Sequence, residues 1–149
     1  MNPSPLQLER HFFTKVQLDA NLAGNPGTAN ELNCAVELAV AEGDPKRFQV
    51  ILRLKLLSPA GRQAGYTGEI HAVGLFRVAD GWPEEKRLPL VEANGAALLY
   101  GAIREMLLTL TTRGPWPPVL LTSVTFVPPK SMPQPEAESP LLSPDLIKK

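Results

Sequence analysis

The fold of this chain is decided by residues 32–56, LNCAVELAVAEGDPKRFQVILRLKL. Apolar side chains occupy every second position on both sides of a short polar break, which is the period of a β-strand with one buried face. The break, Glu42-Gly43-Asp44-Pro45, supplies residues that favour a turn. This stretch therefore predicts two antiparallel strands joined as a hairpin.

Two further strands are expected on either side of the hairpin. Residues 6–20 place apolar side chains at even positions, with a basic and a hydroxyl residue interrupting the face: Leu6, Leu8, Phe12, Val16 and Leu18 against Arg10 and Thr14. Residues 66–78 follow the same period, with an apolar face of Tyr66, Ile70, Phe76 and Val78. Between the first two strands, Gly24-Asn25-Pro26-Gly27 predicts a loop over residues 21–30.

The period of the apolar residues changes after residue 92. Leu99, Ile103, Met106 and Leu110 are spaced by four, three and four residues, which predicts one face of an α-helix from about Asn94 to Thr112. Asn94 is the expected N-cap, and Arg113-Gly114-Pro115 is a strong stop signal. The prolines at positions 83 and 89 predict an irregular segment before the helix, and a short extended stretch is expected over residues 119–126.

Four strands followed by one long helix indicate an α+β domain, with the helix packed on a four-stranded antiparallel sheet. We expect this domain to cover residues 1–127. Six of the 22 residues from Pro128 onward are proline. Such a composition cannot build a packed core, so residues 128–149 are expected to form a disordered tail.

The charge balance excludes several classes of partner. The chain has 149 residues, with 15 basic and 15 acidic side chains and a formal net charge of zero. Attachment to nucleic acid or to an anionic membrane requires a basic excess, so neither partner is expected. The longest apolar run, residues 95–103, is too short to span a bilayer, and the first residues lack the pattern of a secretory signal. We therefore expect a soluble, cytoplasmic protein.

No arrangement of residues that is typical of an active site is recognisable. Cys34 is the one cysteine, which excludes an intrachain disulfide and a thiolate zinc site. The two histidines, His11 and His71, lack neighbouring metal ligands, and no glycine-rich phosphate loop occurs. We expect no enzyme activity, no cofactor and no metal.

The predicted sheet carries apolar residues on both faces. Its second face is expected to present Phe13, Ala35, Ala39, Ile51, Leu57, Val73 and Leu75 among charged side chains. One helix covers only one face, so the remaining apolar surface should be covered by other subunits or by a ligand.

The order and spacing of several blocks resemble the SecB family of bacterial protein-export chaperones. The similar blocks are Phe13-Thr14-Lys15, residues 48–54 (FQVILRL), residues 68–76 (GEIHAVGLF), residues 100–105 (YGAIRE), residues 113–117 (RGPWP) and Val124-Thr125-Phe126. Together they span about residues 6–126. The resemblance implies a dimer of dimers with helices packed between the sheets, and an ATP-independent holdase that keeps polypeptides unfolded and passes them to the SecA motor.

The resemblance also implies roles for individual residues. Client-binding candidates are Cys34, Val36 and Leu38 on the second strand, together with Phe76, Trp116 and Trp82. Trp82 falls in the segment that corresponds to the crossover loop of the family. Glu69 matches an acidic residue that contacts the motor, and the helix stripe of Leu99, Ile103, Met106 and Leu110 is the expected oligomer interface.

Three departures from the family pattern keep other functions open. The chain is neutral where export members are acidic, Thr67 replaces a leucine that accompanies the glutamate, and a proline-rich tail replaces the C-terminal helix. The alternatives are a SecB-like chaperone dedicated to an antitoxin or another specific client, a purely structural oligomerisation module, and a small enzyme.

Overall fold

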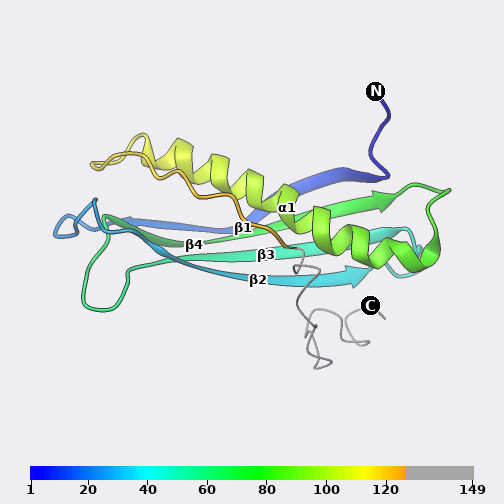
Figure 1. Cartoon of the computed structure of the whole chain (residues 1–149), viewed down its shortest axis with the longest axis horizontal. Coiled ribbons are helices and arrows are strands. Elements are labelled where there is room, and N and C mark those ends of the chain that lie inside the picture. The colour runs from blue at the N-terminus through cyan, green and yellow to red at the C-terminus, as the bar shows by residue number, and fades with distance from the viewer. Residues whose placement is uncertain (127–149) are drawn as a thin grey trace.

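In the computed structural model of this chain, residues 1–126 are described, and they form a sheet with one helix on it (Figure 1). The elements are β1 (Leu6–Ala20), β2 (Glu31–Val40), β3 (Arg47–Leu57), β4 (Tyr66–Val78) and α1 (Glu84–Thr111). The four strands pair antiparallel in the order β1-β4-β3-β2. The predicted α+β class is confirmed. The tail predicted over residues 128–149 lies outside the described residues.

The β2–β3 hairpin has the predicted register. Leu38 pairs with Val50 and Cys34 pairs with Leu54, so the alternating apolar residues of both strands share one face. Gly43 in the turn has a φ of 78°, a backbone conformation that glycine adopts without steric cost. Pairing with β4 continues this face, because Phe48 lies opposite Phe76.

The crossover of the sheet is made by residues 21–30. These residues connect β1 to β2, which lie at opposite edges of the sheet. Two backbone hydrogen bonds of 2.8 Å, from Asn21 to Gly65 and from Asn25 to Gln63, fasten the loop to the start of β4. The expectation that Trp82 belongs to the crossover is wrong, because Trp82 lies in the β4–α1 connection.

The side chains of β1 do not alternate regularly between the two faces of the sheet along the whole strand. Its register with β4 shifts between Leu8 and Arg10 and again between Phe13 and Lys15. Each bulge inserts one extra residue and turns the following side chains to the other face. Phe12 therefore lies opposite Val73 on the face away from α1, and Phe13 packs against the core on the α1 face. This reverses the faces expected for both phenylalanines.

The core lies between α1 and one face of the sheet. Its fully buried side chains come from β2, β3, β4 and α1, and include Leu38, Leu52, Phe76, Leu99 and Ile103. Gly74 and Gly95 allow close packing around Phe76, since an added Cβ on Gly74 would lie 2.5 Å from that ring. Within residues 1–126, no helix combines the length and the apolar character required to cross a membrane.

α1 begins ten residues earlier than the predicted start at Asn94. Pro83 stands at its N-cap, Glu84 and Glu85 fill its first turn, and Pro89 lies inside it. The acidic first turn complements the helix dipole, and the burial of Val91 favours the helical conformation. Local proline signals therefore mislead about this end. The predicted C-terminal stop is confirmed, since Thr112 is the C-cap.

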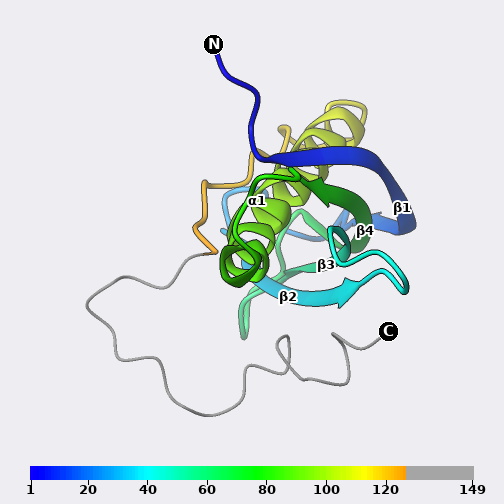
Figure 2. The same cartoon turned by 90° about the vertical axis from the view of Figure 1, so that its right-hand side faces the viewer.

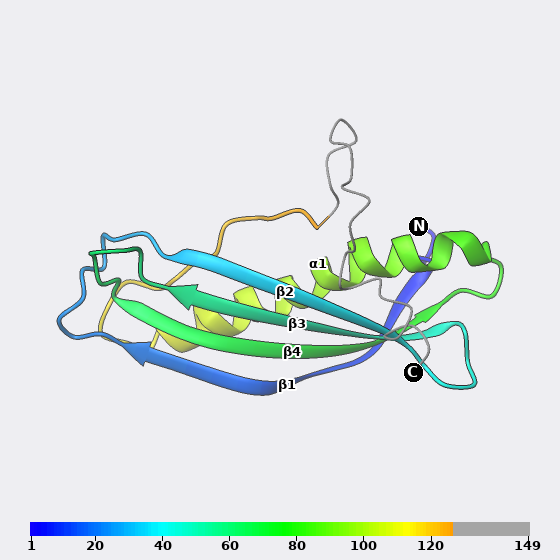
Figure 3. The ribbon, with the colours of Figure 1, turned by 90° about the horizontal axis from the view of Figure 1, so that it is seen from below.

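α1 crosses the sheet diagonally. It starts on the β2 side of the sheet and ends on the β1 side (Figure 3). After the helix ends, the chain returns beside α1 on its β2 side, as Figures 2 and 3 show. We call residues 116–126 the strap. The predicted extended stretch over residues 119–126 is part of the strap and has no strand partner among the described residues.

Candidate functional site

The end of α1 is fastened by a tyrosine and a tryptophan. The hydroxyl of Tyr66, on β4, accepts a hydrogen bond of 3.1 Å from the backbone N–H of Trp116 and lies 3.4 Å from the carbonyl oxygen of Thr111. The indole Nε1 of Trp116 donates to the carbonyl oxygen of Asn21 at 3.1 Å. The strap therefore starts at a fixed point beside the crossover loop.

A cavity of about 230 Å³ lies between this fixed point and the crossover loop. Its wall combines apolar rings with backbone polar groups, and its lining includes Pro26, Asn30, Tyr66, Trp116 and Leu120. Asn30 holds the wall in place through its amide, which donates to the carbonyl oxygens of Tyr66 at 2.8 Å and Leu57 at 3.2 Å. Such a concave site, lined by both polar and apolar groups, can accept a side chain of another polypeptide.

The first half of β2 begins beside this cavity, because Asn30 in its wall directly precedes the strand. Leu32 and Cys34 lie on the same face of the sheet as the core, but the diagonal path of α1 leaves this part of β2 without the helix above it. Cys34 is exposed, and partial burial still raises the pKa of its thiol. We call the surface formed by Leu32, Cys34, Tyr100 and Trp116 the β2 edge site.

Tyr100 reaches this site from α1. Its hydroxyl donates to the carbonyl oxygen of Thr122 in the strap at 2.5 Å, and its ring meets that of Phe126 edge-on at 5.9 Å. Desolvation raises the pKa of Tyr100, and the neighbouring Cys34 adds to that shift. Tyr100 and Tyr66 are not predicted as site residues by the sequence, because a single tyrosine within an apolar helix or strand face has the pattern of an ordinary core residue.

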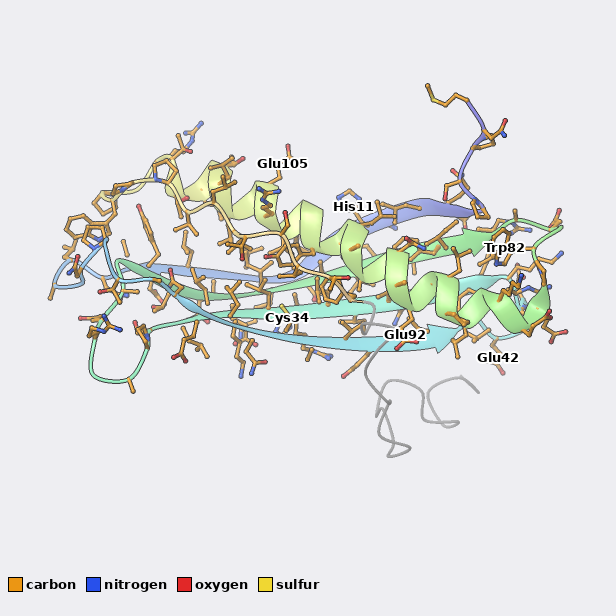
Figure 4. The ribbon with its side chains drawn as sticks, viewed as in Figure 1. His11, Cys34, Glu42, Trp82, Glu92 and Glu105 are labelled. Atoms are coloured by element: carbon orange, nitrogen blue, oxygen red, sulfur yellow. The ribbon has the colours of Figure 1, made fainter. Side chains whose placement is uncertain are left out.

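The other client-binding candidates lie away from this surface. Val36 and Leu38 are buried where the first half of α1 covers β2, and Phe76 is fully buried. A fully buried ring offers no surface to a partner, so Phe76 is a core residue in this structure. Trp82 lies before α1, with its indole donating to the carbonyl oxygen of Lys86 at 3.3 Å, and Figure 4 shows it distant from Cys34.

The face of the sheet away from α1 carries apolar residues that no element within residues 1–126 covers. Near its centre, the half-buried side chains of Phe12, Ile51 and Leu75 meet around Val73, which is only 6% exposed. The guanidinium of Arg10 lies 5.2 Å from the centroid of the Phe12 ring, a cation–π arrangement. The expected apolar content of both faces is confirmed, except that Phe13 lies on the α1 side.

Charged side chains surround this apolar centre as pairs. Arg53 contacts Glu37, and Arg47 lies 3.3 Å from Glu9. Glu69, the candidate motor contact, accepts hydrogen bonds from His71 at 2.6 Å and Lys15 at 3.2 Å. The hydrogen bond from His71 and then that from Lys15 lower the pKa of the Glu69 carboxyl. The Glu69 carboxylate is therefore already bound by side chains of β1 and β4 in the same sheet.

The helix stripe that was expected at an oligomer interface divides into two parts. Leu99 and Ile103 are fully buried against the sheet of the same chain, so they are unavailable to a second subunit. Met106 and Leu110 are half-buried at the margin of α1. The exposed face of α1 instead presents Leu98, which is 48% exposed, and Leu108.

A second cavity, of about 540 Å³, lies beside this exposed helix face. Its lining includes Leu6 and Leu8 from β1, and Ala97 and Leu98 from α1. Leu8 and Val16 on the edge strand β1 are exposed as well. This apolar surface is continuous with the unpaired backbone edge of β1, which makes it suited to a protein partner.

Metal-ligating side chains do not gather anywhere in residues 1–126. His11 and His71 lie on opposite faces of the sheet, because His11 pairs with Gly74, which is three residues from His71 along β4, and successive side chains of a strand alternate between the faces. The exposed apolar side chains and the edges of β1 and β2, which are unpaired within residues 1–126, are the features that suit binding of polypeptide.

Comparisons with known proteins relate this chain to one family. A family model described as "Preprotein translocase subunit SecB" matches residues 7–128. The protein-export protein SecB of Psychrobacter arcticus is 28% identical over 127 residues, covering 81% of this chain and 82% of that protein. Its counterpart in Psychrobacter cryohalolentis is also 28% identical over 127 residues, covering 81% of this chain and 81% of that protein.

A solved structure with a similar fold is a SecB-like chaperone of Mycobacterium tuberculosis, in complex with a ChAD peptide from the HigA1 antitoxin. It superposes with a TM-score of 0.56 at 24% identity, covering 80% of this chain and 91% of that chain. This similarity supports the architecture of a four-stranded antiparallel sheet with one helix.

Proposed function

The chain belongs to the SecB family, and on this premise we propose that it is an ATP-independent holdase chaperone of the cytoplasm. It would bind segments of non-native polypeptides and keep them unfolded, as in protein export. The observation that carries this proposal is apolar surface on both sides of the sheet that a single helix leaves uncovered. No catalytic centre is required.

We propose the β2 edge site as the place where a client chain binds. The cavity beside Trp116 accepts a side chain, and the exposed edge of β2 offers backbone groups to an extended segment. Each contact is weak, but several copies in an oligomer would act together on one flexible chain, which raises its avidity.

We propose a homotetramer built as a dimer of dimers, in which the exposed face of α1 and the edge of β1 form the contacts between subunits. Leu98, Leu108, Leu8 and Val16 are the apolar side chains that support this assignment. It replaces Leu99 and Ile103 with residues on the opposite face of the same helix.

The holdase activity is tested by diluting a denatured client protein into buffer with and without the chaperone. We expect light scattering by aggregates to be suppressed near one tetramer per client, without ATP. Cys34→Arg should weaken the suppression while leaving the sedimentation coefficient unchanged. Absence of suppression across several unrelated clients would contradict the proposal.

A second candidate function is a chaperone dedicated to one client, such as an antitoxin. The contacts of Glu69 favour this candidate, because its carboxylate is already bound by Lys15 and His71. Docking to SecA through Glu69 would have to break these contacts. Isolation of native complexes from the source cell distinguishes the two candidates, because a dedicated chaperone should recover one predominant client, whereas an export chaperone should recover many preproteins and SecA.

A purely structural oligomerisation module is a further alternative. It would use all of its apolar surface between subunits. An intact oligomer that binds neither an apolar dye nor unfolded peptides would favour that alternative over the holdase.

A further inference from the structure

We propose that residues 119–126 of the strap, which follow the fixed Trp116, are a displaceable occupant of the β2 edge site, and that the clients which displace them are extended, uncharged segments carrying a leucine-sized side chain and an aromatic ring. This inference rests on the proposed holdase function. It adds to that function the chemical class of the client segment and the event that opens the site.

The first observation is where the strap lies. It runs beside α1 on the β2 side, next to the part of the sheet that the diagonal helix leaves uncovered (Figures 2 and 3). Leu121 is only 4% exposed and belongs to the same core cluster as Leu54 and Leu99. The strap therefore fills apolar space that would otherwise be open to another chain.

The second observation is how the strap is held. Tyr100 donates to the backbone carbonyl of Thr122, and the backbone N–H of Val119 donates to Oγ1 of Thr111 at 2.9 Å. Both bonds involve the backbone of the strap, so an extended peptide of another sequence can make them. The strap is not paired with a strand of the sheet, so the cooperative ladder that holds β2 does not hold it.

The third observation is the composition of the strap. Residues 114–126 (GPWPPVLLTSVTF) contain no charged side chain, in a chain where one residue in five is charged. Leu120 is 61% exposed and Val124 is 40% exposed, so the strap presents apolar side chains even away from the core. A segment of this kind resembles the unfolded, apolar stretches that a holdase binds.

These observations define what the site selects. Leu121 occupies the buried position, the Phe126 ring packs edge-on against Tyr100, and Thr122 supplies the carbonyl. A client must compete with a tethered segment, so its apparent affinity is reduced by the fraction of molecules in which the strap is bound. Weakening the strap should therefore tighten client binding without any new contact.

The test compares a buried and an exposed apolar side chain of the strap in the full chain. Leu121→Ser removes the buried side chain, and Val124→Ser changes an exposed one that does not line the cavity beside Trp116, as the matched control. The probe is a fluorescent synthetic peptide with the sequence of residues 115–126, PWPPVLLTSVTF. We expect Leu121→Ser to bind it at least about threefold more tightly than the wild type, and Val124→Ser to stay within about twofold.

A second measurement uses the wild-type protein, so that it does not depend on correct folding of the Leu121→Ser variant. In the ¹⁵N-labelled wild-type protein, binding of the unlabelled peptide should accelerate amide hydrogen exchange of residues 119–126. Phe126→Ala, with Val124→Ala as its control, provides a milder weakening of the strap at a half-buried position.

The outcomes separate the inference from the proposed function. If the wild type binds the peptide and suppresses aggregation, but exchange of residues 119–126 is unchanged or slower and no strap variant tightens binding, the strap inference is overturned and the holdase stands. If neither peptide nor unfolded client binds to any variant, both proposals are overturned.

Discussion

The indole of Trp116 donates a hydrogen bond of 3.1 Å to the carbonyl oxygen of Asn21, 95 residues earlier in the chain. This bond joins the end of α1 to the end of β1 and so fixes the start of the strap. Tyr66 completes the joint from β4. Because the three elements meet at one point, the geometry of the β2 edge site depends on it.

Trp116→Phe should lower the free energy of unfolding by about 1 kcal/mol, because it leaves the Asn21 carbonyl without its donor. Urea denaturation followed by circular dichroism measures this loss. Trp82→Phe is the control, since its indole bond to Lys86 lies at the exposed start of α1 and its loss should cost much less. Equal losses for the two variants would contradict the structural role given to Trp116.

The bulges of β1 predict losses of stability of different size for two adjacent phenylalanines. Phe13 packs against the core, so Phe13→Ala should reduce stability by about 2 kcal/mol. Phe12 lies on the open face beside Arg10, so Phe12→Ala should cost about 1 kcal/mol or less. Urea unfolding curves for both variants check the order, and a larger loss for Phe12→Ala would mean that β1 keeps an unbulged register.

Glu69→Gln should destabilise the protein slightly at neutral pH, and the difference should disappear in acid. The pKa of Glu69 is lowered by His71 and Lys15, so the ionised form is favoured in the folded state. Its contribution is fully present above the ordinary pKa of a glutamate and is lost as the pH falls through the lowered pKa. Unfolding of both proteins at a series of pH values below about 5 measures this convergence.

Glu31→Gln serves as the control for this titration. Glu31 is exposed at the start of β2 and forms no ion pair with the residues that the structure describes. Glu31→Gln therefore removes a carboxylate without removing an ion contact, and the convergence in acid expected for Glu69→Gln should exceed any seen for Glu31→Gln. A difference between wild type and Glu69→Gln that does not change with pH would contradict the role of the ion contacts.

Leu98→Glu should dissociate the assembly while each subunit stays folded. The side chain lies on the exposed face of α1, so the new carboxylate is solvated in a monomer but would be desolvated between two subunits. Sedimentation velocity and circular dichroism measure the two properties. Leu22→Glu, in the exposed crossover loop at 77% exposure, should leave the oligomer unchanged.

Alkylation of Cys34 should be slower than that of a cysteine in a short peptide at pH 8. Burial raises the pKa of this thiol and so lowers the fraction of reactive thiolate at pH 8. The rate of alkylation should therefore increase as the pH is raised above 8. Iodoacetamide labelling followed by mass spectrometry of the intact chain measures the rate. Because Cys34 is the one cysteine, labelling reports on the β2 edge site alone. A rate equal to that of the peptide would show that burial has no influence on this thiol.

Local periodicity was sufficient to predict the β2–β3 hairpin, β4 and the C-terminal half of α1. In each, the apolar residues recur at the spacing of one buried face, and the turn or stop residues follow directly. The same reasoning failed at the start of α1, where Pro89 suggested an irregular segment but the burial of Val91 favours the helix. It also failed on β1, where a simple alternation hid two bulges.

The amino-acid pattern was enough to establish that this chain forms a sheet with apolar residues on both faces and too little helix to cover them, because side-chain alternation is a local property. The tertiary fold was needed to show which residues remain accessible. Pairing with β4 places Phe12 and Phe13, and the diagonal path of α1 separates buried Leu38 from exposed Cys34 on one strand. The contacts of Tyr100 with Thr122 and of Trp116 with Asn21 join residues that are distant in the chain, so no local pattern could reveal them.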